Sequence, residues 1–250
     1  MSSAIDRSKL AVGEVVDRAR SEMTPLNTQF SYFCVMPVAE EDLKQYLHDP
    51  IAALPPGAAK TLPKVGVVLV PYLDRVNGRA SEVVTFERPP DHRYAYSAVV
   101  HSDSHVTLVM AIKEEEVANY HYTLYNEIAG VIGARLKKDE QRDSFDRLLR
   151  EELSGEVHGE VDDRSWHLKQ SFLRRQTNIR KETKLFRDYA RQAFQDTLTL
   201  YLHGICCDID VETGPRQLPS RYLRKRLELL ISLFPPPAGY AVFPEQLKQR

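Results

Sequence analysis

The sequence predicts an α+β protein, with an antiparallel sheet of about four to five strands in the N-terminal half and a helical C-terminal half. Three observations lead to this prediction. Strand-forming segments are concentrated between residues 30 and 112, helical periodicity dominates from residue 113, and no repeat of fixed period interrupts this order. The 250 residues are 42% hydrophobic and 28% charged, so enough apolar material is present for a folded core.

The N-terminal segment is expected to mix short helices with one strand. Residues 4–22 have the spacing of an amphipathic helix, and residues 30–37 (FSYFCVMP) are rich in strand formers. The following segment AEEDLKQYLHD has acidic residues in its first turn, where they favour a helix. The stretch 50–63 is rich in Pro, Gly and Ala, which is typical of a mobile connector.

Four strand candidates follow, at residues 64–73, 81–88, 93–101 and 105–112. Their links are too short for a helical crossover, so all four are expected in one antiparallel sheet. The last two flank Ser-Asp-Ser, which predicts a hairpin with a three-residue loop. This hairpin would place His101 and His105 across from each other at its mouth, and it is favoured over a metal site formed by His101, Asp103 and His105.

Five helices are predicted in the rest of the chain, at residues 113–137, 139–153, 164–181, 183–204 and 219–234. Asp162 or Asp163 is expected to cap the third, Gly204 to end the fourth and Pro235 to stop the last. The polar segment 154–163 is the predicted boundary between a sheet-containing part, 1–153, and a helical part, 164–250.

The helix at 113–137 has two contrasting faces. A hydrophobic stripe is expected to face the core, and it contains Val117, Tyr120, Leu124, Ile128, Val131 and Ile132. The opposite face carries Asn119, Asn126, Gly130 and Gly133. Two glycines within a helix cost about 1 kcal/mol each relative to alanine, which indicates close approach of another chain segment or an open groove.

The segment TLYNEIAG in this helix resembles the active-site helix of zincin metallopeptidases, which carries the pattern H-E-x-x-H. Glu127 matches the general base, whereas Asn126 and Gly130 occupy the positions of the two zinc-binding histidines. Asn and Gly do not serve as ligands of catalytic zinc. The resemblance therefore implies a zincin-like fold without peptidase chemistry, preceded by a sheet whose edge strand helps to bind a peptide. The alternative is an ordinary packed helix with a glycine face.

A second candidate site is the segment HGICCDIDVE, which follows an apolar helical stretch. In an extended conformation Asp208, Asp210 and Glu212 share one face, beside His203, and such a set can hold a divalent metal. This set would support a metal-dependent hydrolase. The alternative is a buried helix end, in which Cys206 and Cys207 act as small hydrophobic residues.

A third candidate is a basic surface in the C-terminal half. Residues 164–226 contain 14 Lys and Arg against 6 Asp and Glu, while residues 1–163 contain 18 against 27. Arginine binds phosphates through paired hydrogen bonds, which suggests a nucleic-acid-binding module using Arg174, Arg175, Arg180 and Arg224. Lys169, Arg187, Arg191 and Arg226 are expected on the same solvated faces. The alternatives are solvated helix faces without a ligand, or pairing with the acidic N-terminal half.

Composition limits the remaining possibilities. Three cysteines are too few for a disulfide framework, no secretory leader is recognisable, and no apolar run is long enough for a membrane span. We therefore expect a cytoplasmic protein with no membrane partner. The leading hypothesis is a non-catalytic binding or regulatory protein with a protein or peptide partner. A nucleic-acid partner or a divalent metal cofactor would follow from the two alternatives.

Overall fold

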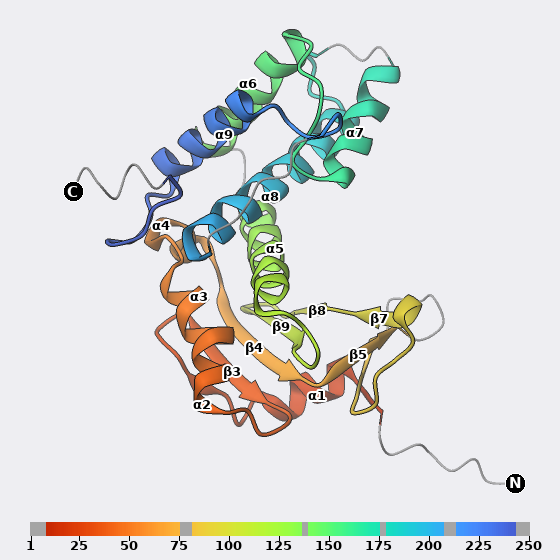
Figure 1. Cartoon of the computed structure of the whole chain (residues 1–250), viewed down its shortest axis with the longest axis vertical. Coiled ribbons are helices and arrows are strands. Elements are labelled where there is room, and N and C mark those ends of the chain that lie inside the picture. The colour runs from red at the N-terminus through yellow and green to blue at the C-terminus, as the bar shows by residue number, and fades with distance from the viewer. Residues whose placement is uncertain (1–8, 76–81, 137–139, 176–178, 208–213, 244–250) are drawn as a thin grey trace, which may run out of the picture. The chain divides into compact units, whose positions relative to one another are not determined.

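The computed structural model confirms the α+β class (Figure 1), and it describes residues 9–75, 82–136, 140–175, 179–207 and 214–243. The chain forms two compact units. The first contains residues 1–52 and 62–127, and the second contains residues 53–61 and 128–250. Their division falls inside helix α5 (Val117–Arg135), whereas the sequence placed a boundary at 154–163.

The first unit contains a mixed five-stranded sheet. Its strands lie in the order β2 (Thr24–Pro25), β3 (Phe30–Cys34), β4 (Lys64–Val70), β9 (His105–Ala111) and β8 (Ser97–His101). β4 pairs in parallel with both β3 and β9, and β8 is antiparallel to β9 at the edge. Residues 65–70 of β4 are all buried, as expected for the central strand of a sheet covered on both faces.

A smaller antiparallel sheet belongs to the same unit. Its order is β1 (Leu10–Ala11), β6 (Glu82–Thr85), β5 (Tyr72–Arg75) and β7 (Tyr94–Ala95), and the short helix η2 (Asp91–Arg93) precedes β7. An antiparallel sheet of four strands in the N-terminal half is therefore confirmed, but the prediction that all four strand candidates share one antiparallel sheet was wrong. The segment 64–73 divides at Pro71 into strands of different sheets. The residues between β4 and β9 include the strands β5, β6 and β7 of this second sheet and also β8, and this long connection allows β4 and β9 to run parallel.

Helix α1 (Val12–Ala19) covers one face of the five-stranded sheet. Its Val12, Val15, Val16 and Ala19 are buried with Val68 and Val70 of β4 and with residues of β8 and β9. The helix is amphipathic as predicted, but it is shorter than the predicted range 4–22, because Leu10 and Ala11 form β1 and the helix ends at Ala19. Burying such an apolar face stabilises a short helix that would be marginal alone.

The predicted hairpin is confirmed, because β8 and β9 pair in antiparallel orientation and Ser102 N–H donates to the carbonyl of His105 at 2.9 Å. Its register differs from the expectation by one residue. His101 lies opposite Val106, so the two histidines do not face each other across the strands. Both are exposed, and Ser104 Oγ is 2.6 Å from His105 Nδ1.

The stretch 50–63 is not an open connector. It follows α2 (Glu40–Leu43) and the π-helical segment η1 (Lys44–His48), and it contains most of α3 (Asp49–Ala52) and all of α4 (Pro56–Thr61). Several of its apolar residues are buried, namely Pro50, Ile51, Ala53, Leu54, Ala58 and Leu62. Proline is tolerated in the first turn of a helix, where its missing N–H leaves no hydrogen bond unmade.

The second unit is helical. Its long helix α8 (Lys184–Cys206) packs against α6 (Glu140–Ser154), α7 (Asp163–Arg174) and α9 (Ser220–Leu233) (Figure 1). Asp162 caps α7 by accepting from Arg164 N–H at 3.0 Å. α8 continues through Gly204 to Cys206, so that glycine does not end it. Among the described helices, none combines the length and apolarity needed to cross a membrane.

The segment 154–163 is not a polar linker. Val157 and Glu160 are buried, and Glu160 pairs with Gln217 in an isolated bridge. Gly159 has a φ of +84°, and a Cβ at that position would come within 2.1 Å of the Gln217 carbonyl oxygen. Only glycine allows this close approach, which brings Glu160 into the interior of the second unit.

Candidate functional site

The free edge of strand β8 is the candidate binding site of the first unit. β8 ends the five-stranded sheet, and among the described strands it pairs with β9 alone. The hydrogen bonds Ala111 N–H to Tyr96 O and Ser102 N–H to His105 O fix the pattern of the ladder. Because the pattern alternates along an antiparallel pair, the N–H and C=O groups of Ser97, Val99 and His101 point away from β9.

Helix α5 follows β9 directly in the chain and contributes Glu127 beside this edge. Ser97 Oγ donates a hydrogen bond to Glu127 Oε1 at 2.7 Å. Glu82 on β6 lies close enough to Glu127 for the two carboxyl groups to interact electrostatically. Burial raises the pKa of the Glu82 carboxyl, Arg75 at 3.9 Å lowers it, and Glu127 raises it further. This side of the edge strand therefore presents two carboxyl groups that disfavour an additional negative charge.

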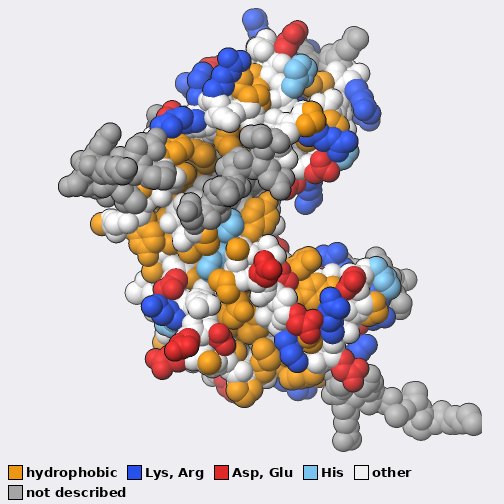
Figure 2. Space-filling model, in the orientation of Figure 1, with side chains coloured by type: hydrophobic (Ala, Val, Ile, Leu, Met, Phe, Trp, Pro, Cys, Tyr) orange, Lys and Arg blue, Asp and Glu red, His pale blue; other side chains and the backbone are white. Residues whose placement is uncertain are grey.

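An acidic cavity of about 380 Å³ adjoins the start of β8. It is lined by Arg88, Asp91, Tyr94, Tyr96, Lys113, Glu114, Glu115, Glu116 and Asn119. Tyr96 directly precedes β8, so the cavity adjoins the N-terminal end of the edge strand. Figure 2 shows Asp and Glu side chains around the N-terminal end of α5, with Lys and Arg side chains beside them.

The charges in this cavity are unevenly paired. Arg88 binds both Asp91 and Glu114, each at 3.0 Å, and Tyr72 Oη donates to Glu114 at 2.7 Å. Among the residues that the structure describes, Glu115 and Glu116 have no ion-pair partner. Burial raises the pKa of the Glu115 carboxyl, and the neighbouring Glu116 charge adds to this effect. The cavity is thus suited to a cationic group that would neutralise these two carboxylates.

The NEIAG positions divide between the two units. Glu127 belongs to the first unit and bonds to Ser97, and Asn126 is half-buried. Gly130 belongs to the second unit, where a Cβ would meet the Gln195 amide nitrogen at 3.2 Å. A Cβ at Gly133 would meet the Phe194 ring at 3.5 Å. The glycine face of α5 therefore allows close approach of α8, which is one of the two explanations that the sequence left open.

Of the metal cluster predicted at His203, Asp208, Asp210 and Glu212, the structure describes one residue. His203 is buried in α8, as expected for an apolar helix end. Asp208, Asp210 and Glu212 lie outside the described residues. In the part of the chain that is described, His203 is thus the single member of the predicted set whose position is known.

The basic residues of the second unit fall into different environments. Arg174 and Arg175 lie at the C-terminal end of α7, and Arg180 lies in the loop before α8. Arg224 pairs with Glu228 at 2.9 Å on the exposed side of α9 and stacks on the Phe243 ring. The structure does not bring these four residues together in any described cavity. Figure 2 shows Lys and Arg side chains on the exposed surface over α9.

Two basic residues predicted to be solvated are fully buried. Arg226 donates to Glu152 at 3.1 Å and to Glu160 at 2.7 Å, and Lys169 Nζ donates to Glu160 at 3.0 Å. Burial alone would raise the pKa of the Glu160 carboxyl. Arg226, Lys169 and the Tyr189 hydroxyl instead hold this pKa at about 2. We call these five residues the buried ion network, namely Glu152, Glu160, Lys169, Tyr189 and Arg226.

The zincin resemblance implied an edge strand that helps to bind a peptide, but the sequence did not identify this strand as β8, because strand pairing depends on the fold. Glu114, Glu115 and Glu116 were visible as an acidic run, but such a run is usually a solvated surface. The signal that could have drawn attention to them is their position between the last strand and the helix that carries Glu127. Comparison of the chain with protein families, curated proteins and solved structures gives no match.

Proposed function

We propose that this protein is a non-catalytic binding protein that holds an extended, basic peptide segment along the free edge of β8. The observation that carries the proposal is the set of outward-facing backbone groups of Ser97, Val99 and His101. A peptide strand added there would form main-chain hydrogen bonds with all three residues. Alternate side chains of the peptide would then point toward the side of the sheet that carries Glu127.

The charges beside the edge favour a basic peptide. Glu115 and Glu116 line the cavity at the start of β8, Glu127 accepts a hydrogen bond from Ser97, and Glu82 lies near Glu127 in the same unit. A Lys or Arg side chain entering this cavity would find two carboxylates that have no ion-pair partner among the described residues. Complementary charge increases the association rate and excludes acidic competitors.

The likeness to the zincin active-site helix supports binding without catalysis. A zincin of this type would bind its peptide along the edge strand and would hold zinc through histidines at positions 126 and 130. A histidine at position 130 would need space that the Gln195 amide occupies, at 3.2 Å from a Cβ there. The residues of this helix thus favour a scaffold that retains the peptide edge and lacks two of the three zinc ligands that a catalytic site needs.

The proposal is tested with Val99→Pro and its control Val99→Thr. Proline removes the outward N–H of Val99 without removing a hydrogen bond to β9, whereas threonine keeps the N–H and the shape. The probes are fluorescein-labelled pools of extended peptides, one rich in Lys and Arg and one rich in Asp and Glu, followed by fluorescence anisotropy. We expect the parent and Val99→Thr to bind the basic pool and Val99→Pro to lose at least about tenfold in affinity.

Unchanged affinity of a folded Val99→Pro variant would overturn the edge-strand proposal. Equal affinity for the acidic pool would overturn the proposed charge preference. The double variant Glu115→Gln, Glu116→Gln tests the charge preference separately from the edge strand, because it leaves the strand edge intact. It should weaken binding of the basic pool only, most strongly at low salt.

A further inference from the structure

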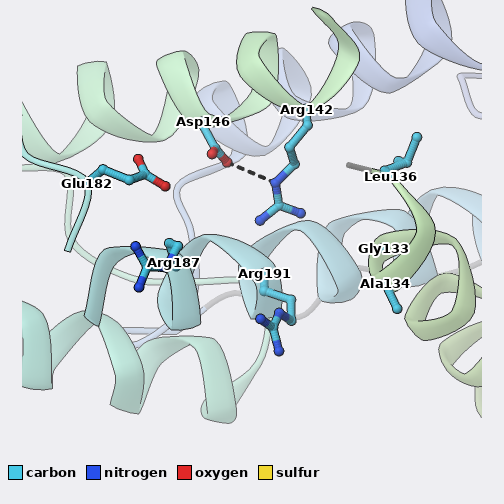
Figure 3. Close-up of a pocket in the computed structure, with 8 residues that line it drawn as sticks. All are labelled: Gly133, Ala134, Leu136, Arg142, Asp146, Glu182, Arg187 and Arg191. Carbon is cyan, nitrogen blue, oxygen red and sulfur yellow. Dashed lines mark ion pairs between the residues drawn. The ribbon is translucent and has the colours of Figure 1, made fainter. Parts of the chain in front are cut away.

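A second cavity, in the second unit, carries a different charge. It has a volume of about 330 Å³ and is lined by Gly133, Ala134, Leu136, Arg142, Asp146, Glu182, Arg187 and Arg191. Figure 3 shows that α6 provides Arg142 and Asp146, α8 provides Arg187 and Arg191, and the end of α5 provides a small apolar wall. All eight residues belong to one compact unit, so the cavity is formed within it.

Each carboxylate in this cavity already has a cationic partner. Asp146 forms an ion pair with Arg142 at 3.1 Å, and Glu182 forms one with Arg150 at 2.9 Å. Arg150, which is not a lining residue, also stacks on the Phe186 ring, with its guanidinium carbon 3.7 Å from the ring centroid. Glu182 is thereby held by a cation outside the cavity. Among the described residues, the ion pairs of these two acids are thus with Arg142 and Arg150 and not with Arg187 or Arg191.

Arg187 and Arg191 are left without an ion-pair partner among the residues that the structure describes. They are four residues apart on α8, so their side chains lie on the same face, one turn apart. Two like charges at this spacing repel each other, and an anion between them removes the repulsion. Both side chains are exposed, and Figure 3 shows them on the same wall of the cavity, below Arg142 and Asp146.

Arg142 supplies a third guanidinium from the opposite wall. Its side chain is only 12% exposed, and it is held by Asp146 and by the Phe194 ring, 5.2 Å from the guanidinium carbon. Burial raises the pKa of the Asp146 carboxyl, although the Arg142 charge opposes this change. This side of the cavity is therefore partly shielded from water, where a charged hydrogen bond is stronger than at an open surface.

We infer that this cavity binds the phosphomonoester group of a small molecule. Guanidinium groups match the oxygen spacing of a phosphate and can each donate two hydrogen bonds to it. Two unpaired arginines correspond to the two charges of a phosphomonoester, whereas a nucleic-acid diester carries one charge per phosphate. The wall formed by Gly133, Ala134 and Leu136 leaves room for an apolar part of the ligand. The inference is independent of peptide binding at β8.

The test uses the full chain with phenyl phosphate, inorganic phosphate and acetate as probes, measured by isothermal titration calorimetry at fixed ionic strength. We expect saturable binding of phenyl phosphate and weaker binding of inorganic phosphate. Arg187→Gln and Arg191→Gln should each weaken phenyl phosphate binding by about tenfold or more, the usual effect of losing a charged hydrogen bond. Arg147→Gln is the matched control, since Arg147 is an exposed arginine of α6 that does not line the cavity.

Four outcomes would overturn the inference. The first is the absence of saturable binding of either phosphate. The second is equal affinity for acetate, which would mean that the cavity attracts any anion. The third is equal weakening by Arg147→Gln, which would mean a diffuse charge effect. Duplex DNA serves as a further competitor, and binding of DNA through Arg187 and Arg191 without phenyl phosphate binding would overturn the inference in favour of a polyanion surface.

Discussion

The buried ion network and the cavity that Arg142, Arg187 and Arg191 line, here called the arginine cavity, contain the same residue types in the same unit but differ in burial and charge pairing. In the network, Arg226 is fully buried and both carboxylates bonded to it are buried with it. In the cavity, Arg187 and Arg191 remain exposed and have no ion-pair partner among the described residues. A buried charge destabilises the fold unless it is paired, whereas an exposed charge is solvated by water and remains available to a ligand. Pairing and burial therefore distinguish a structural arginine from a candidate binding arginine.

The largest expected effect is the loss of Arg226. The substitution Arg226→Met leaves Glu152 and Glu160 buried without their guanidinium, and we expect the free energy of unfolding to fall by about 3–5 kcal/mol. Chemical denaturation measures this change. Arg224→Met is the matched control, because Arg224 and Glu228 on the same helix are each about half exposed and their pair contributes about 0–1 kcal/mol. Equal effects of the two substitutions would remove the distinction between the regions.

The buried ion network should also make the stability of the protein depend on pH in the acidic range. The pKa of Glu160 is about 2 in the folded protein, against 4.5 for an ordinary glutamate. The folded state therefore binds fewer protons than the unfolded state between these values, so the stabilisation is complete above about pH 4.5 and is lost as the pH falls toward 2. We expect this pKa difference to contribute roughly 3 kcal/mol to the free energy of unfolding above pH 4.5. Denaturation at several pH values should give a shallower acid dependence for Glu160→Gln than for the parent.

Asp196 on α8 should show the opposite dependence. Burial raises its pKa to about 6, while hydrogen bonds from Ser165 and Gln192 lower it and the charges of Asp162 and Glu160 raise it. The folded state then binds more protons than the unfolded state between about pH 4 and 6, so stability falls as the pH rises through this interval. Asp196→Asn removes the buried charge.

We expect Asp196→Asn to be more stable than the parent at pH 7 by about 1–3 kcal/mol, and this difference should disappear near pH 4. Thermal unfolding across this range measures it. A variant that is less stable than the parent at every pH would instead mean that the carboxylate is needed for its hydrogen bond with the Gln192 amide at 2.6 Å.

The smallest expected effect on stability belongs to the arginine cavity. Arg187→Gln and Arg191→Gln should change the free energy of unfolding by no more than about 0.5 kcal/mol, as exposed substitutions usually do. Chemical denaturation without added phosphate gives the comparison with Arg226→Met. A loss of several kcal/mol would show that these arginines hold the fold together, and the contrast between the two regions would fail.

Local pattern was enough to predict several elements. The hairpin of β8 and β9, the apolar stripe of α5 and the Asp162 cap of α7 follow from side-chain alternation, helical spacing and turn chemistry, all of which act over a few residues. The sheet pairing could not be predicted in this way. β4 pairs with β9, which follows about forty residues later in the chain. Strands β5 to β8 lie between them in the sequence, so no local pattern connects the two strands.

The candidate sites were harder to predict than the elements. Glu127 was selected from a short helical motif, but the free edge beside it depends on which strand ends the sheet. Arg187 and Arg191 were recognised only as part of a basic run. Arg142 and Asp146 lie on another helix, about forty residues earlier, and no local pattern connects them with α8. Arg226 looked solvated because its neighbours Arg224 and Lys225 are, although its own position on α9 faces inward.

The sequence by itself determined the α+β class, the approximate positions of the long helices and the concentration of basic residues in the second half. These properties depend on the periodicity and composition of neighbouring residues. The helix predicted at 164–181 is an exception, because α7 ends at Arg174 and residues 179–181 are not helical. Only the tertiary structure decided which strand has a free edge and which charges are paired. Both depend on residues distant in the chain, since hydrogen bonding and charge pairing are set by distance in space, and burial determines their strength.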